Sequence, residues 1–231
     1  MDREIEFLNA PTAEQRLENL KTLLAEEKEK PAVLPQYANN HIHTTFSFSP
    51  YSPTAAVWAA RRAGLQTAGI MDHDSISGAK EFRCAAALAG VGATCGVEMR
   101  VDWRDTPFAD KKTNNPDQAG VSYMTFHSVR ERYFEQMREF IAPYREFRNQ
   151  RNIKMLANIK EVTGISIDFE NDVLPLSQYA NGGSVTERHL LFALAKKVLP
   201  DGSEDEQYKL LGKYKSGLIR EVYVNPTDEL V

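Results

Sequence analysis

The feature that most restricts the fold of this chain is a series of short apolar runs, typical of strands, that alternate with helical segments. Four such runs follow Tyr37, at residues 39–44, 66–71, 93–101 and 121–126. Ser52 and Pro53 predict the start of a first helix and Gly64 its end, and a second helical pattern covers 78–89. Strands joined by helices of this length usually pair in parallel, so the sequence predicts an α/β fold.

The segments before and between the strands differ from them in composition. Residues 1–37 are predicted to form a helical appendage to a domain of residues 38–231. Leucines recur on one stripe of residues 12–30, which predicts an amphipathic helix docked outside the domain, or an arm that binds a partner. The polar stretch 102–120 is too long for a simple connection and predicts an active-site flap.

Two further helices are predicted in the second half of the chain. A long one covers 130–162 and is expected to bend at Pro143, because proline cannot donate the helical hydrogen bond. The other covers 185–198, and Ser184 and Glu187 have the spacing of a capping box at its start.

Composition and charge exclude several classes of protein. Lys and Arg total 28 and Asp and Glu 32, for a net charge of −4 without a basic run, which argues against a non-specific nucleic-acid coat. Two cysteines give no disulfide framework and fit a reducing compartment. No apolar stretch approaches about 18 residues and the N-terminus is acidic, so we expect a cytoplasmic protein without a membrane span.

The histidines carry the main chemical signal. Four of the five lie at or just after the end of a predicted strand, and only His189 lies on a helix; the four are His41, His43, His73 and His127. In parallel α/β folds, sites are built at that edge of the sheet. His41 and His43 are two residues apart, so on a strand both imidazoles face the same side.

A carboxylate stands at the corresponding end of the third strand. Glu98 interrupts an apolar run, and either a metal ion or an arginine partner would offset the cost of burying its charge. Taken singly, each of these residues has an ordinary structural interpretation. A His-x-His pair lies on a solvated strand edge as often as it binds a metal. Histidines such as His127 and His189 are more often hydrogen-bonded than metal-bound, and a residue such as Asp74 more often caps a helix. Together, His or Glu at four successive strand ends predicts a site for zinc, manganese or iron.

These segments resemble the motifs of the PHP (polymerase and histidinol phosphatase) family. In order, they are His41-Ile-His43-Thr44-Thr45-Phe46-Ser47, Ile70-Met71-Asp72-His73-Asp74-Ser75-Ile76-Ser77-Gly78, Gly96-Val97-Glu98 and His127. The resemblance covers about residues 38–130 closely and extends more loosely to His189. It implies a distorted seven-stranded β/α barrel with a helical insertion at about 130–183. It also implies hydrolysis of a phosphoester, which could be a phosphomonoester, a nucleotide or a nucleic-acid end.

The resemblance also implies roles for individual residues. The six implied ligands would share two or three divalent ions. His41 and His43 would bind the first ion, and Glu98 would bridge it to a second. His127 and His189 would also bind the second ion, and His73 would bind the third. Asp72 and His73 are the implied catalytic residues, with Asp72 behind the ligands and a metal-bound hydroxide as the predicted nucleophile. Arg188 is the implied ligand of the substrate phosphate.

The chain departs from the family pattern at three places. Ser49 stands near where relatives carry a further Asp or His ligand, and Glu187 stands where relatives often carry an arginine. No histidine follows His189, so the family's last motif, Asp-x-His, is missing. We therefore expect an incomplete barrel from the N-terminal part of a longer protein, with fewer ions. Its open strand edges would favour a homo-oligomer.

Two alternatives to a metal-dependent phosphoesterase remain at this point. The chain could be an inactive metal-binding PHP module with a scaffold or regulatory role, which the missing last motif supports. A barrel amidohydrolase also uses His-x-His, but it needs a bridging lysine, and Glu98 occupies that place. The expected partner of the hydrolase is a phosphorylated small molecule or nucleotide, and the charge does not indicate nucleic acid.

Overall fold

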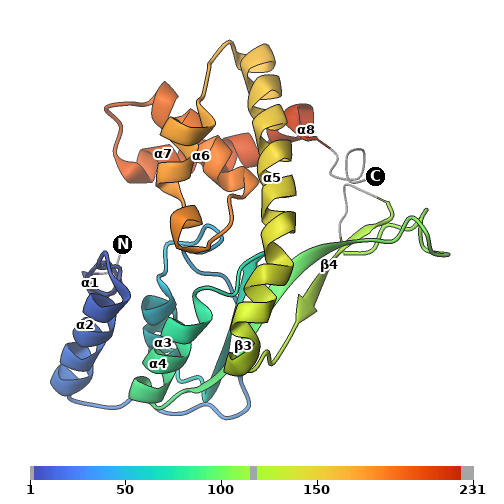
Figure 1. The fold of residues 1–231 in the computed structure, drawn as a ribbon. Coiled ribbons are helices and arrows are strands. Elements are labelled where there is room, and N and C mark those ends of the chain that lie inside the picture. The colour runs from blue at the N-terminus through green and yellow to red at the C-terminus, as the bar shows by residue number, and fades with distance from the viewer. Residues whose placement is uncertain (1–2, 115–118, 225–231) are drawn as a thin grey trace.

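The computed structural model describes residues 3–114 and 119–224, and it has the predicted α/β architecture. One curled sheet holds the strands in the order β1 (Ala38–Ile42), β2 (Thr67–His73), β3 (Gly92–Asp102) and β4 (Val121–Phe126) (Figure 1). The described residues thus form four strands, and a closed seven-stranded barrel is not confirmed.

The first three strands and their helices follow the predicted pattern. α3 (Pro53–Arg62) and α4 (Ala79–Ala89) connect β1 to β2 and β2 to β3, and both strand pairs are parallel. The Ser52 hydroxyl accepts a hydrogen bond from the Ala55 amide at 3.0 Å and caps α3. Gly64 follows the helix with a left-handed φ of +74°, and an added Cβ would lie 2.4 Å from the Ala32 carbonyl oxygen. Only glycine fits this turn.

The fourth strand departs from the predicted parallel pairing, which is wrong for β4. Val121 pairs with Asp102 and Phe126 with Val97, so β4 runs antiparallel to β3. The described residues between these strands contain no helix, and without a crossover the chain can only return antiparallel. Residues 115–118 of this predicted flap lie outside the described part. The C-terminal end of β4 therefore lies beside the middle of β3.

Two N-terminal helices cover the outer side of α3 and α4 (Figure 1). They are α1 (Arg3–Leu8) and α2 (Ala13–Glu26), and α2 lies within the predicted amphipathic segment. Leu20 is fully buried in the same hydrophobic core as Phe82 of α4. Beside it, Arg16 binds Glu81 at 2.6 Å, and both side chains are largely buried. This pair ties α2 to α4.

The second half of the chain is mainly helical. α5 continues through Pro143 as one helix, and its first half packs on the sheet core while its second half packs on a separate core with α6 and α8. Figure 1 shows α5 joining the two parts. The helices here are 131–133, α5 (Phe134–Thr163), 169–173, 174–176, 179–181, α6 (Glu187–Val198), α7 (Glu204–Ser216) and α8 (Ile219–Val222).

The start of α6 also differs from its prediction. The expected capping box of Ser184 and Glu187 is wrong, because the Ser184 amide donates to the Phe46 carbonyl and Glu187 is the first helical residue. The box forms two residues later, where the Thr186 amide donates to Nδ1 of His189 at 2.9 Å. No described helix combines the length and apolar character needed to cross a bilayer.

Candidate metal centre and adjoining cavity

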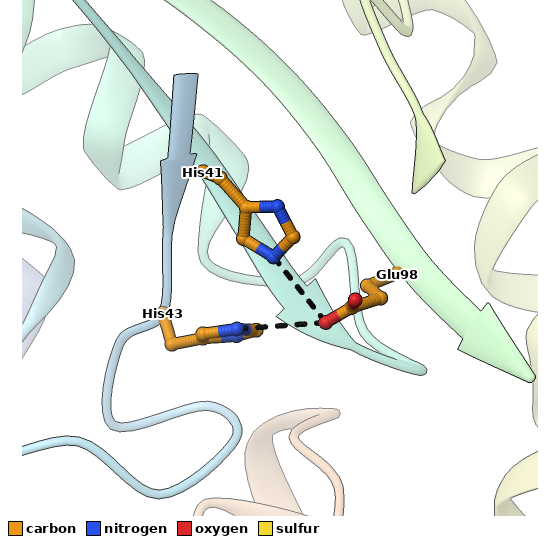
Figure 2. Close-up of side chains that lie close together, drawn as sticks. All are labelled: His41, His43 and Glu98. Atoms are coloured by element: carbon orange, nitrogen blue, oxygen red, sulfur yellow. Dashed lines mark hydrogen bonds and ion pairs between the residues drawn. The ribbon is translucent and has the colours of Figure 1, made fainter. Parts of the chain in front are cut away.

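Four side chains with nitrogen or oxygen donors converge at the C-terminal ends of β1 and β2 and beside the middle of β3. We call His41, His43, His73 and Glu98 the donor cluster. Glu98 Oε2 lies 3.3 Å from His41 Nε2, 3.5 Å from His43 Nε2 and 3.1 Å from His73 Nδ1. Figure 2 shows the rings of His41 and His43 directed at this oxygen. Three imidazoles therefore surround one carboxylate oxygen.

Burial favours the neutral form of two of these imidazoles, those of His43 and His73. It lowers the pKa of His43 to about 4, helped by the charges of His41 and Arg188, and it lowers the pKa of His73 well below its usual value. Burial also raises the pKa of Glu98, against the favourable charge of His41. Neutral rings keep lone pairs that can bind a cation, whereas protonated rings cannot.

The nitrogen of His73 that faces Glu98 tests whether a cation fits here. Nδ1 is buried and has no hydrogen-bond partner in the described part of the chain, although Glu98 Oε2 lies 3.1 Å away. The donor atoms of His41, His43 and Glu98 all lie within 4.8 Å of one another, and His73 lies outside that group of three, with its Nδ1 3.1 Å from Glu98 Oε2. Mixed imidazole and carboxylate donors at this spacing suit a first-row divalent ion. The cluster is a candidate metal centre.

Asp72 lies behind the cluster and anchors the loop that follows β1. Its carboxylate accepts hydrogen bonds at 2.6 Å from the Thr44 amide, the Thr44 hydroxyl and the Ser47 hydroxyl. Burial raises the pKa of Asp72 to about 6, although these hydrogen bonds act against the rise. Ser47 Oγ also lies 3.4 Å from Nδ1 of His43. Asp72 therefore holds the hydroxyl that orients a cluster imidazole.

The structure does not bring His127 and His189 into this group, as far as the described residues extend. His127 is exposed after β4, because the antiparallel strand ends beside the middle of β3. His189 is 1% exposed, and its Nδ1 accepts the Thr186 amide. A neutral ring in that arrangement carries its proton on Nε2, so neither nitrogen offers a lone pair to a cation. Their role as ligands stays a prediction from the family resemblance.

A cavity of about 400 Å³ adjoins the cluster at His73. Cationic side chains dominate its wall, and Glu187 is the only carboxylate among the described lining residues. The cations are Arg100, Arg148, Arg188 and Lys215. Because the chain as a whole is acidic, this concentration of positive charge is local. We call this space the basic cavity.

Ion pairs fix two of these arginines. Glu187 Oε1 lies 2.8 Å from Arg100 and also binds Arg151, and Asp74 binds Arg148, with 2.6 Å from Oδ2 to Nε. Burial alone would raise the pKa of Glu187, but Arg100 and Arg148 outweigh it and hold the value at about 2. Asp74 thus binds an arginine and does not cap α4, which contradicts the helix-cap interpretation.

The sequence analysis did not predict most of the residues that line the basic cavity. Arg100 stands two residues after Glu98 and so shares its face of β3, which the period of two could have indicated. Arg148 of the wall follows the spacing of one helix face together with Arg151 and Asn152, which do not line the cavity, but such a polar stripe is usually solvent-exposed. Here all three are buried.

The fold and the site define an α/β protein with a candidate metal centre beside a basic cavity. The model of the PHP domain family matches residues 39–221, which is more than half of the chain. The chain belongs to the PHP domain family.

Curated relatives match shorter segments. A 5'-3' exoribonuclease from Haemophilus influenzae is 36% identical over 63 residues, which are 27% of this chain and 23% of that protein. An error-prone DNA polymerase from Mycobacterium tuberculosis is 30% identical over 110 residues, 47% of this chain and 10% of the polymerase. The chain therefore spans well under two thirds of either relative.

Two solved structures share the fold at 20% identity. A candidate metal-dependent phosphoesterase from Bifidobacterium adolescentis aligns with a TM-score of 0.57 over 85% of this chain and 60% of its own. An amidohydrolase from Chromobacterium violaceum, solved with sulfate and no metal, aligns with a TM-score of 0.55 over 81% and 58%. At this identity the likeness concerns the fold alone.

Proposed function

We propose that this chain is a metal-dependent phosphoesterase whose donor cluster holds a divalent ion at the end of the basic cavity. The observation that carries the proposal is the orphaned Nδ1 of His73, which shares Glu98 Oε2 with two further imidazoles. A divalent ion bound there would supply a nucleophile from water at neutral pH and stabilise negative charge on a phosphoryl group.

The residues of the chain would bind and orient the substrate. The wall of the basic cavity offers guanidinium groups, which bind phosphate oxygens in a planar, bidentate geometry. Arg100 and Arg148 are already held by Glu187 and Asp74, so little side-chain entropy is lost when a phosphate binds. Asp72 and Ser47 would keep the His43 ring aimed at the ion.

Within this proposal, the favoured substrate is a nucleotide or the end of a nucleic acid. Two relatives carry the names of enzymes that act on nucleic acids, and the basic cavity is large enough for more than a phosphate ion. The dinucleotide in the experiment below tests this assignment.

The test is removal and restoration of metal. Protein stripped with a chelator is assayed on p-nitrophenyl phosphate and on a dinucleotide, before and after addition of Mn²⁺ or Zn²⁺. We expect activity on at least one substrate to vanish on stripping and to return with metal, and H43A to lose it. Activity that is unaffected by stripping, or that never returns with either metal, contradicts the proposal.

A second candidate is a metal-binding module without hydrolytic activity. The separation of His127 and His189 from the donor cluster favours it, because fewer ligands would then hold fewer ions. Stoichiometric metal in the purified protein, with no hydrolysis of either substrate under any metal, would support this alternative.

A further inference from the structure

The hydroxyl group of Tyr123 is held by an arginine in the wall of the basic cavity. Nε and Nη2 of Arg100 donate hydrogen bonds to the Tyr123 hydroxyl oxygen, at 3.1 Å and 2.8 Å. A hydroxyl oxygen has two lone pairs, and Arg100 occupies both of them. The hydroxyl can therefore form a further hydrogen bond only as a donor, and nothing in the described part of the chain accepts its proton.

Backbone contacts on both sides of β4 fix the position of Tyr123. On one side, Tyr123 pairs with Arg100 in the antiparallel ladder of β3 and β4. On the other side, the Asn114 side chain donates to the Tyr123 carbonyl at 2.7 Å and accepts from the Tyr123 amide at 2.8 Å. The strand, the flap and the arginine thus hold the phenol in one place before any substrate binds.

The Tyr123 ring lies at the end of the cavity that adjoins the donor cluster. Its centroid is 5.7 Å from the centroid of the His73 ring, and His73 Nδ1 is 3.1 Å from Glu98 Oε2. Tyr123 and His73 line the same cavity. Under the proposed function, the phosphoryl group reacts at the donor cluster and the rest of the substrate extends into the cavity. The bond that breaks joins these two parts, so it lies at the end where Tyr123 stands.

We propose that Tyr123 is the general acid of the hydrolysis and protonates the leaving oxygen of the phosphoester. This inference rests on the proposed function. A water molecule adds its oxygen to phosphorus and releases a proton to solvent while the P–O bond to the leaving group breaks. The phenolic proton passes to the leaving oxygen, and the phenolate regains a proton from solvent water. The two hydrogen bonds from the positively charged Arg100 stabilise the phenolate, which favours the transfer.

Two other hydroxyl groups of the cavity wall are less suited to this role. Tyr223 also lines the cavity, but the guanidinium groups of Arg100 and Arg151 lie over its ring, 5.8 Å and 5.6 Å from the centroid. Burial raises the pKa of Tyr223, so its proton is held more tightly. Ser47 already donates its proton to Asp72 at 2.6 Å.

The test compares two esters that differ in the acidity of the leaving phenol, because a poor leaving group needs protonation and a good one does not. The kcat of the Mn²⁺-loaded protein is measured on phenyl phosphate and p-nitrophenyl phosphate, or on the corresponding esters of thymidine 5'-phosphate if only diesters react. Y123F should lose about 100-fold on the phenyl ester and less than about threefold on the p-nitrophenyl ester. Its metal content should match that of the wild type.

Y223F is the matched control, because Tyr223 lines the same cavity and has no arginine bonded to its hydroxyl in the described part of the chain. It should leave the ratio of the two kcat values unchanged. An equal loss on both esters in Y123F, or no loss on either, overturns the role of Tyr123 and leaves the proposed function standing. If the wild-type protein hydrolyses no ester with Mn²⁺ or Zn²⁺, the proposed function fails and this inference fails with it.

Discussion

The two sides of the site are stabilised in opposite ways. On the sheet side, three imidazoles crowd a carboxylate, and a buried nitrogen of His73 has no hydrogen-bond partner among the described residues. On the helical side, Glu187 and Asp74 already bind the guanidinium groups around them. The sheet side therefore offers donor atoms that the described chain leaves without a cation partner, whereas the arginines of the helical side are already bound by Glu187 and Asp74. Under the proposed function, this difference assigns metal binding to the donor cluster and substrate orientation to the paired arginines, of which Arg100 lies on β3 and Arg148 on α5.

The largest effect should come from Glu98→Gln, on the sheet side. Loss of the shared carboxylate should lower metal affinity and hydrolysis by at least about 100-fold. The metal-free protein should be as stable as the wild type or more so, because burial disfavours this charge and raises its pKa. Metal titration and urea unfolding in chelator measure the two effects.

Glu161→Gln is the matched control, because Glu161 is exposed on α5. It should leave both quantities unchanged. If E98Q instead unfolds the metal-free protein easily, Glu98 contributes to folding, and the contrast between the two sides fails.

The next effect concerns pH and tests His189 on the helical side. Burial lowers the pKa of His189 to about 4, from 6.5 when unfolded. Between these values the unfolded chain binds a proton that the folded chain does not. The free energy of unfolding should therefore fall as pH drops from 6.5 toward 4, by about 2–3 kcal/mol from this residue.

Glutamine at this position can keep the capping hydrogen bond but cannot titrate. H189Q should thus flatten part of the pH dependence of urea unfolding and retain the wild-type metal content. Loss of a bound ion in H189Q would instead make His189 a ligand, as the family resemblance implies.

Glu187→Gln should produce a smaller loss of stability on the helical side. Removing one partner of a fully buried ion pair costs about 3–5 kcal/mol, but the Glu187 side chain is 19% exposed, so we expect about 2 kcal/mol. The misoriented arginines should also raise KM about tenfold while kcat changes less. Urea unfolding and steady-state kinetics measure these changes, with exposed Glu221→Gln as the control. A change confined to kcat would instead indicate that Glu187 acts in the chemical step and not in substrate binding.

The sequence predicts the sheet side well because its signals are local. His41 and His43 share a face through the period of two, and Glu98 is conspicuous as a charge within an apolar strand. The parallel pairing of β1 to β3 follows from the helices between them. The antiparallel β4 was missed because the connection before it was interpreted as a flap and not as a direct return.

The helical side could not be predicted in the same way. Its ion pairs join residues far apart in the chain, such as Arg148 to Asp74 and Arg100 to Glu187. No local period connects such partners, and single charged residues are usually solvent-exposed. His189 shows the same limit, because a histidine that accepts a backbone amide looks identical in sequence to a metal ligand.

The smallest effect should come from Ser47→Ala and tests how finely the sheet side is arranged. The Ser47 hydroxyl has one proton, which it donates to Asp72 at 2.6 Å, so the His43 contact at 3.4 Å requires Nδ1–H to donate. That tautomer leaves Nε2 free for a cation. Without the hydroxyl the tautomer is no longer fixed, and metal affinity should fall by about tenfold, the lower end for such partners because the contact is long.

Zinc titration and imidazole ¹⁵N NMR of S47A measure the affinity and the His43 tautomer directly. Ser49→Ala is the control in the same loop, because no contact joins Ser49 to the imidazole among the described residues. A tautomer and an affinity that both match the wild type would show that the donor cluster orients His43 without help from Asp72. The orientation of His43 would then depend only on the proposed ion and the other donors, in contrast to the arginines of the helical side, which Glu187 and Asp74 already orient.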